Sequence, residues 1–377
     1  MAKLGEVFTI ASGGTPDKGN PFYYENGTIP WVKTGDLKNQ YVPTGIDCIT
    51  EEGLNNSSAK LFPPNTVLVA MYGATIGACS ILSYEAATNQ ACAAFLPNEN
   101  VLPTYLYYFL SSKRDQFVKD GVGGAQPNIS AGYLKNVQFG LIPMQQQIDI
   151  VEKLDKVEKL IALRKEQLAK LDQLVKSRFV ELFGDTPDEE KKTMADICKI
   201  ITDGTHQPPK FTSTGIPFLF VSNIVTNEIH YDAEKFISEE TYAELIKRTP
   251  IAIGDILLST VGSYGHPAVV KSDKPFCFQR HIAYLKPNAD MVNSEYLRGA
   301  ILSADVQRQI DERVKGIAQK TLNLSEIRKL QLPLPSMEQQ EQFAAFVEQT
   351  DKSKLAIQYS LNKLELLKKS LMQKYFG

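Results

Sequence analysis

Side chains that can pair with the edges of nucleic-acid bases are concentrated in turn-rich stretches of this sequence. Asparagine and glutamine amides can pair bidentately with adenine, and arginine or lysine with guanine, while neighbouring lysines can bind phosphates. The alternative for any one such residue is that it caps a turn. We predict DNA contacts at Lys18, Lys33, Asp36, Lys38, Tyr72, Asn89, Gln90, Gln126 and Asn128 in the first half, and at His206, Gln207, Lys210, Asn223, Ser263, Tyr264, His266, Gln279, Arg280 and Lys320 in the second.

Motifs that would supply catalysis are missing from the sequence. It contains neither a Walker loop nor an HExxH pair, and the nuclease-like spacing of Pro187–Lys191 falls in a linker without flanking strands. The glycine-rich stretch Gly121–Gly124 lacks the strand-to-helix context of a cofactor loop. The four histidines and five cysteines lack metal-ligand spacing, and we expect reduced, mostly buried thiols. We therefore predict no catalytic residue, no metal site and no cofactor in this chain.

Length and charge limit the possibilities further. The 377 residues are enough for two domains with separate cores, and 43% hydrophobic and 22% charged residues are typical of a folded globular protein. The formal net charge of −2 lacks the basic excess of proteins that hold DNA alone, so a DNA-binding protein of this composition needs local basic patches or a partner's charge. Neither a membrane-spanning run nor a signal peptide is visible, and we expect a cytoplasmic protein without a membrane partner.

The elements that must position these loops occur twice along the chain. Landmark segments recur in the same order at a separation of roughly 190 residues, as expected for two diverged copies. The matching pairs are Gly27–Val32 with Gly215–Leu219, Pro64–Leu68 with Ile253–Leu257, Gly73–Gly77 with Gly262–Gly265, Asn89–Ala93 with Gln279–Ala283, Pro143–Gln147 with Pro335–Gln340, and Phe183-Gly184 with Phe376-Gly377.

Each copy begins with a strand-rich part and ends with a long helix. Short β-branched and aromatic runs between turns predict strands at Thr66–Met71, Ile253–Thr260 and Ala268–Lys271, and short helices are expected at Thr104–Lys119 and Ser294–Arg313. The predicted fold class is α+β with a pseudo-twofold internal repeat. The predicted domains are 1–143, a helix at 144–184, a linker with the second domain at 185–335, and a helix at 336–377.

The long helices carry an apolar seam. Residues 144–183 contain neither glycine nor proline, and forty helical residues make a rod of roughly 60 Å. Apolar residues at spacings of three, four and seven predict that the two helices pack as an antiparallel coiled coil. The alternative is that each helix only covers its own domain. The predicted seam consists of Leu154, Val157, Ile161, Leu168, Leu171, Val175 and Leu182 in the first helix, and Ile357, Leu361, Leu364, Leu371 and Tyr375 in the second.

These features together resemble the specificity (S) subunit of type I restriction–modification systems. The most specific carrier is the step from proline through Glu/Gln-Gln into each long helix. The other carriers are Ser12–Pro16, Ile29–Val32, Gly35–Leu37, Gly124–Ser130, Asp203–His206, Gly215–Leu219, Val261–Gly265 and Gln279–Ala283.

The resemblance implies a non-catalytic DNA-binding subunit. Each globular part would be a target recognition domain that reads one half of a bipartite, non-palindromic DNA site, and the coiled coil would set the spacer. Two methyltransferase (M) subunits, which carry AdoMet and methylate adenine, would dock on the helices, and two translocase-nuclease (R) subunits would join for cleavage. A type IIB specificity subunit and a protein scaffold that does not read DNA remain alternatives, and whether the complex cleaves or only methylates stays open.

Overall fold

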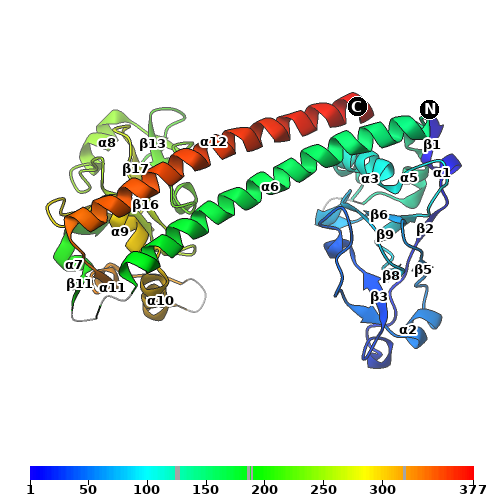
Figure 1. Cartoon of the computed structure of the whole chain (residues 1–377), viewed down its shortest axis with the longest axis horizontal. Helices are drawn as coiled ribbons and strands as arrows, with labels where there is room; N and C mark the ends of the chain where they lie inside the picture. Colours follow the sequence, from blue (N-terminus) through cyan, green and yellow to red (C-terminus); the bar gives the residue numbers. More distant parts are fainter. Residues whose placement is uncertain (124–127, 185–186, 188–189, 317–319) are drawn as a thin grey trace. The chain divides into compact units, whose positions relative to one another are not determined.

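The computed structural model describes residues 1–123, 128–184, 187, 190–316 and 320–377 (Figure 1). The chain divides into two compact units. Unit 1 contains Met1–Arg164 and Ser360–Gly377, and unit 2 contains Lys165–Tyr359. Each unit therefore combines one strand-rich part with a portion of both long helices. The predicted domain boundaries, which assign each helix separately, remain predictions.

Unit 1 is built on two four-stranded sheets and a short pair. The first sheet is antiparallel and follows the order β2 (Ile10–Ser12), β9 (Cys92–Phe95), β6 (Val67–Ala70) and β7 (Cys79–Ile81). The second contains a parallel pair, β3 with β8, and follows the order β4 (Cys48–Ile49), β3 (Ile29–Val32), β8 (Ala86–Thr88) and β5 (Leu61–Phe62). The remaining elements are the pair β1 (Ala2–Lys3) and β10 (Gln138–Phe139), the α-helices α1 (Leu4–Val7), α2 (Glu51–Asn55), α3 (Pro103–Ser112), α4 (Arg114–Asp120) and α5 (Ala131–Asn136), and the 3₁₀ helices η1 (Pro21–Tyr23), η2 (Thr34–Asp36) and η3 (Gly73–Thr75).

Unit 2 repeats this topology. Its antiparallel sheet follows the order β12 (Cys198–Asp203), β18 (Ile282–Pro287), β15 (Ile256–Ser259) and β16 (Pro267–Val269). Its second sheet again contains a parallel pair, β13 with β17, in the order β14 (Phe236–Ile237), β13 (Ile216–Leu219) and β17 (Cys277–Phe278). The remaining elements are the pair β11 (Lys191–Thr193) and β19 (Gln331–Pro333), the α-helices α7 (Met194–Ile197), α8 (Glu239–Leu245), α9 (Ser294–Ile301), α10 (Ala304–Arg313) and α11 (Leu324–Ile327), and the 3₁₀ helix η5 (Val221–Asn223).

The predicted α+β class and the internal repeat are confirmed by this shared topology, and the predicted strands are present in shorter form. The two stretches expected to be helical are each interrupted. At the first break, the Lys113 backbone has φ −90° and ψ 1°, outside the helical region, between α3 and α4. At the second, Ser303 is extended, and its hydroxyl accepts the Val306 N–H at 3.3 Å to cap α10. A serine that can cap a new helix competes with continuation of the old one.

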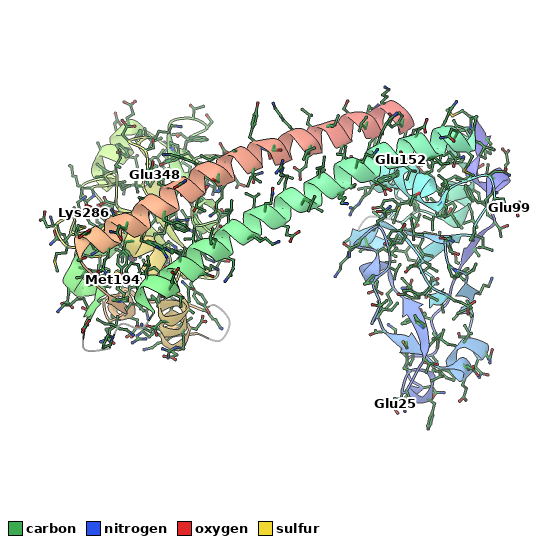
Figure 2. The ribbon with its side chains drawn as sticks, in the orientation of Figure 1. Glu25, Glu99, Glu152, Met194, Lys286 and Glu348 are labelled. Carbon is green, nitrogen blue, oxygen red and sulfur yellow. The ribbon has the colours of Figure 1, made fainter. Side chains whose placement is uncertain are left out.

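The two long helices are α6 (Met144–Phe183) and α12 (Met337–Phe376), each of 40 residues. Glu152 on α6 and Glu348 on α12, both labelled in Figure 2, are exposed polar side chains of these helices. Helices of this length without glycine or proline form because good helix formers dominate the sequence and one stripe is covered by apolar contacts.

The helices pack antiparallel within each unit. In unit 1 the start of α6 lies beside the end of α12, where Glu158 pairs with Lys368 and Leu154 shares a core with Phe376. In unit 2 the end of α6 lies beside the start of α12. There the Lys354 ammonium is 2.5 Å from the Asp172 carboxylate, and the Phe179 and Phe343 rings are 5.4 Å apart.

The seam is apolar but less uniform than its sequence pattern suggests. Four of its predicted members are buried, namely Leu154, Val157, Ile161 and Leu361. The others are partly buried, namely Leu168, Leu171, Val175, Leu182, Ile357, Leu364, Leu371 and Tyr375. Polar residues at the same helical spacing complete it, including Thr350, Lys354 and Lys368. Because each unit uses a portion of both helices, the alternative in which a helix only covers its own domain does not hold.

Candidate nucleic-acid interface

The parallel strand pair of unit 1 brings separate loops to one edge. Because parallel strands end on the same side, the turn after β3 and the turn after β8 become neighbours. The Asn89 N–H donates to the Val32 carbonyl at 3.0 Å, which places the Asn89-Gln90 turn beside Lys33. On the other side, the Gln90 side chain bonds the Thr15 hydroxyl. Three segments that are distant in sequence therefore meet here.

The Tyr72 loop extends this line. The Met71 N–H donates to the Ala91 carbonyl at 2.8 Å, so this loop lies against the Asn89-Gln90 turn. Asn128 then bridges to Tyr72 on one side and to Val122 on the other. Tyr72 is 42% exposed and Val122 is 75% exposed, so both present apolar surface beside polar neighbours.

Unit 2 repeats the same junction with different side chains. The Gln279 N–H donates to the Leu219 carbonyl at 3.1 Å, and the Thr260 N–H donates to the His281 carbonyl at 2.9 Å. The Gly262 N–H donates to the Lys320 carbonyl at 3.1 Å, which adds the last segment. We call these gathered segments the contact loops, namely residues 13–16, 33–38, 71–75, 89–91, 122 and 128 in unit 1, and 203–207, 220–223, 260–264, 279–281 and 320 in unit 2.

Several predicted contact residues use their side chains to hold these loops. The Asn223 oxygen accepts the Phe220 N–H at 2.9 Å, and its amide donates to the His230 carbonyl at 3.0 Å. The Asp36 carboxylate accepts the Lys33 N–H at 2.8 Å. The Tyr264 hydroxyl donates to Asp311 at 2.9 Å, and the partly buried His266 lies 3.3 Å from the Asn227 side-chain oxygen. Such residues shape the interface without needing to touch a ligand.

The remaining predicted residues are more open to solvent. Exposed members of the contact loops are Lys38, Tyr72, Gln90, Asn128, His206, Gln207, Ser263, Arg280 and Lys320, while Lys33, Asn89 and Gln279 are partly exposed. Lys18 and Lys210 are exposed in the segments that follow these loops. Gln126 lies outside the described residues. The assignment of contacts to individual residues remains a prediction.

One charged cluster escaped the sequence analysis. At the end of β12, the Asp203 carboxylate lies 2.5 Å from the Arg248 guanidinium and 2.9 Å from His206 Nε2. Arg248 is 45 positions away from Asp203 in the chain. The motif containing Asp203 and His206 was visible in the sequence, but nothing in the sequence connects it to Arg248.

Burial shifts the pKa of four thiols and of two histidines. Burial raises the pKa of the thiols of Cys79, Cys92, Cys198 and Cys277 to about 12, so they stay protonated and unreactive at neutral pH. Burial lowers the pKa of His266, and burial together with Arg280 lowers that of His281. Both imidazoles are therefore neutral at pH 7 and available for hydrogen bonds. Among the described residues, no group of metal-ligating side chains is assembled.

A buried glutamine attaches each strand-rich part to a long helix. In unit 1, the Gln147 oxygen accepts the Leu102 N–H at 2.9 Å, and its amide donates to the Asn100 and Ile142 carbonyls at 2.8 and 2.9 Å. In unit 2, the Gln340 oxygen accepts the Asn293 N–H at 2.8 Å. Its amide donates to the carbonyls of Met291 and Pro335 at 3.1 and 2.9 Å. The glutamine that recurs at the start of each long helix therefore has a structural role, because it fixes the helix to the neighbouring strand-rich part.

The outer faces of the helices form a second candidate surface. On α12, Leu355, Tyr359 and Leu366 are 64–71% exposed, and their spacing of four and seven places them on one face. On α6, Leu160, Leu163 and Leu174 are 44–47% exposed. Exposed leucines repeated at helical spacing on a rod are typical of a surface that another protein covers.

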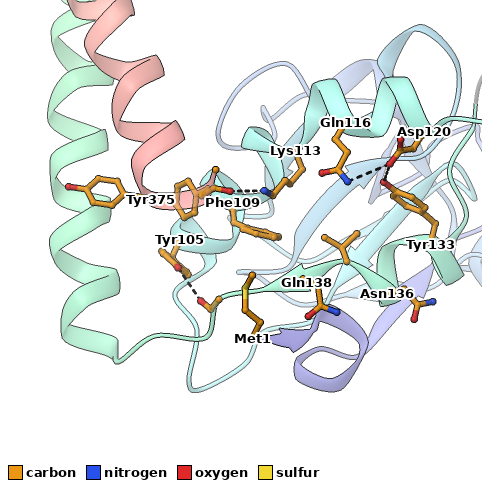
Figure 3. A pocket seen from close by; sticks show the side chains of 14 residues that line it. Met1, Tyr105, Phe109, Lys113, Gln116, Asp120, Tyr133, Asn136, Gln138 and Tyr375 are labelled. Carbon is orange, nitrogen blue, oxygen red and sulfur yellow. Dashed lines mark hydrogen bonds between the residues drawn. The ribbon is translucent and has the colours of Figure 1, made fainter.

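A pocket of about 400 Å³ lies in unit 1 away from the contact loops (Figure 3). Tyr105, Phe109 and Tyr375 line it, and the Lys113 ammonium donates to the Phe376 carbonyl at 2.6 Å at its edge. The predicted contact residues are not among its lining residues. The pocket therefore belongs to the packing of α12 on unit 1.

In the described part of the chain, a helix that could cross a bilayer is not found.

Comparison with known proteins gives consistent matches. The family model described as "Type I restriction modification DNA specificity domain" matches residues 1–173 and 188–366. The Type I restriction enzyme MjaIX specificity subunit of Methanocaldococcus jannaschii is 25% identical over 375 residues, covering 92% of this chain and 85% of that protein. The Type I restriction enzyme EcoR124I/EcoR124II specificity subunit of Escherichia coli is 31% identical over 162 residues, covering 42% of this chain and 40% of that protein. A crystal structure of a type I restriction–modification system S subunit from M. genitalium shares the fold, with a TM-score of 0.55, 15% identity, and coverage of 100% of this chain and 95% of that one.

Proposed function

Because this chain belongs to the type I restriction–modification DNA specificity family, we propose that it recognises a bipartite, non-palindromic DNA site and directs partner enzymes to it. The observation that carries this proposal is the pair of contact-loop sets. Both sets are assembled by the same backbone hydrogen bonds at a parallel strand pair, yet they present different side chains. Two units with the same strand framework and different contact loops are suited to recognising two different half-sites.

The proposed function is compatible with a chain that has no excess of basic residues. Base edges are read by directional hydrogen bonds, whereas phosphate contacts supply most of the salt-dependent affinity. A chain of net charge −2 needs a partner to supply part of the second contribution. Partner subunits that help to enclose the duplex would supply it.

The partners we propose are two M subunits and, in the full complex, two R subunits. The exposed leucines of α6 and α12 support the helices as the M-subunit docking surface, since they repeat along both rods. The M subunits would hold AdoMet and methylate adenine, and this chain would contribute specificity without catalysis. The complex would act in the cytoplasm, with the DNA that it binds.

The test is to sequence methylated adenines in cells that express this chain with its M subunits. We expect methylation at one bipartite site whose two halves differ and whose spacer has one length. Cells that express the M subunits without this chain provide the control. Methylation at a contiguous site, a variable spacer, or methylation independent of sequence would overturn the proposal. Protection of the same bipartite site by the purified complex would support it independently.

A further inference from the structure

The Asp203 cluster of unit 2 consists of Asp203, His206 and Arg248. Asp203 is the last residue of β12 and pairs with Ala283 of the neighbouring strand, so its backbone is fixed by the sheet. Its side chain is 14% exposed, while those of His206 and Arg248 are 54% and 51% exposed. One carboxylate oxygen faces Arg248 and the other faces His206, so neither oxygen is idle. The carboxylate is thereby held in one orientation.

The cluster belongs to the contact loops by direct backbone bonding. The Thr205 N–H donates to the Phe278 carbonyl at 3.2 Å, and the Arg280 N–H donates to the Thr205 carbonyl at 3.1 Å. The segment that carries Asp203 and His206 is therefore bonded to the turn that carries Gln279 and Arg280. Arg248 also borders a small recess of about 110 Å³ beside Thr205. Its guanidinium consequently lies at the edge of the predicted reading surface.

The chemistry of the cluster favours a base over a phosphate. The Arg248 guanidinium gives one N–H, through Nη2, to the Asp203 carboxylate and keeps its other N–H donors for a partner such as guanine O6 and N7. The adjacent carboxylate cancels most of the positive charge. A phosphate gains mainly from net charge, so this pairing weakens a phosphate site while it keeps the directional donors.

The corresponding place in unit 1 lacks such a carboxylate. The Gly14 N–H donates to the Thr88 carbonyl at 2.9 Å, as that of Thr205 does to Phe278, and Ser12 pairs with Ala93 as Asp203 does with Ala283. A serine therefore stands in unit 1 where unit 2 has Asp203. The carboxylate-held arginine is therefore a feature of unit 2 within this pair of equivalent sites.

We propose that Arg248, oriented by Asp203, is a specificity-determining residue that reads a guanine in the half-site contacted by unit 2. This inference rests on the proposed function. Arg248 would make the base contact, and Asp203 would act as a positioning residue.

The test uses the full chain assembled with its M subunits and a set of duplexes. The set contains the site identified by sequencing of methylated adenines, single base-pair replacements across both of its halves, and an unrelated duplex. With Arg248→Gln, we expect the cognate affinity to fall about 5- to 150-fold, which is the range of about 1–3 kcal/mol for a lost bidentate contact. Discrimination at one G·C pair of one half should disappear, while discrimination elsewhere is kept.

Two further variants separate the possible roles. Lys247→Gln removes a neighbouring exposed cation and should leave discrimination intact at every position. Asp203→Asn keeps the cation but frees it, so discrimination at the same G·C pair should weaken while affinity for the unrelated duplex rises. Arg248→Lys keeps the charge without the planar fork, and it should lose the same discrimination even if Arg248→Gln folds poorly.

The outcomes are distinguishable. A uniform loss of affinity on all duplexes with Arg248→Gln would make Arg248 a phosphate contact and overturn the inference. Unchanged discrimination in both Arg248 variants would make the cluster a surface ion pair only, and would also overturn it. If the unaltered complex shows no sequence preference at all, the proposed function itself fails.

Discussion

At the scale of single residues, the contact loops separate side chains that hold a loop from those that face solvent. Asn223 saturates its amide with backbone groups of its own loop, whereas Arg280 is exposed, with its Nε 3.4 Å from His281 Nε2. Both are residue types suited to base readout. The structure therefore makes Arg280 the sharper test of recognition, and Asn223 a test of loop stability.

Replacing Arg280 with alanine should relax specificity in one half-site. A lost bidentate contact corresponds to about 1–3 kcal/mol of discrimination at one base pair. The measurement is binding of the assembled complex to single base-pair variants of its site. The Lys247→Ala variant, at an exposed cation outside the predicted contact residues, is a charge-matched control, and it should keep all discrimination. An equal loss on every duplex with Arg280→Ala would instead identify a phosphate contact.

His266 should make the fold sensitive to mild acid. Burial lowers its pKa in the folded chain below the ordinary value of about 6.5, so the unfolded chain binds the proton more readily. The contribution of neutral His266 to the free energy of unfolding is fully present above pH about 6.5, and it is lost as the pH falls towards the pKa of His266 in the folded chain. We expect His266→Asn to lose less unfolding free energy between pH 7.5 and pH 5.5 than the unaltered chain, measured by chemical denaturation at both values. An identical loss in both proteins would contradict this assignment.

At the scale of elements, the start of each long helix is fixed to its strand-rich part by one amide. Gln147 and Gln340 each bond three backbone groups and are almost fully buried. A buried amide in this position converts the beginning of a helix into a rigid joint, because any rotation would break all three bonds together.

Replacing Gln147 with alanine should destabilise unit 1. The Leu102 N–H and two carbonyls would lose their partner, and each buried orphan costs about 1–3 kcal/mol. We expect a loss of at least about 2 kcal/mol in unfolding free energy, whereas Gln146→Ala, at the exposed neighbour, should change it by less than about 0.5 kcal/mol. Denaturant titration measures both. Equal effects of the two substitutions would show that the joint does not depend on Gln147.

The two faces of α12 should respond differently to the same substitution. Leu361 is 5% exposed, so Leu361→Asp should cost about 3 kcal/mol or more and disrupt the packing of the helices. Leu355 is 71% exposed, so Leu355→Asp should leave folding intact and weaken binding of the M subunits. Denaturation and size-exclusion chromatography with the M subunits measure the two effects. Leu168 and Leu171 are only partly buried and give a weaker contrast. Normal M-subunit assembly with Leu355→Asp would remove this face from the docking surface.

Across the whole molecule, the two units share the same framework of strands and helices but carry different contact loops. The buried glutamine, the parallel strand pair and the antiparallel packing of α6 with α12 occur in both units. The contact loops differ, with Lys33 and Tyr72 in unit 1 and the Asp203 cluster in unit 2. Because the contact loops of one unit can change while its strands and helices stay the same, one half-site can vary without the other.

Exchanging residues 190–335 for the corresponding part of a relative should change one half-site only. The other half-site and the spacer should stay as they were, because unit 1 and the helices are unaltered. Sequencing of methylated adenines measures all three features at once. A control exchange of the same segment with its contact loops and Arg248 restored should return the original site. If both halves change together, the two parts are not independent readers.

Sequence pattern alone predicts the duplication, the α+β class, the long helices and most of their seam. These features are periodic or local, since turn residues, helical spacing and missing glycine or proline act over a few neighbouring positions. The family resemblance followed from the order of such local motifs. The same local patterns did not predict the breaks at Lys113 and Ser303, where a single residue leaves the helical conformation.

Which loop residues meet, and what their side chains do, depends on how the chain folds in three dimensions. Gln147 belongs to a motif that the sequence displayed, but two of its three partners, Leu102 and Asn100, come from a distant segment. Arg248 meets Asp203 only because a strand end and a turn after a helix converge, and no periodicity records that contact. Pairings of this kind depend on chain topology and long-range hydrogen bonds, which is why local sequence pattern finds a recognition scaffold but not its points of contact.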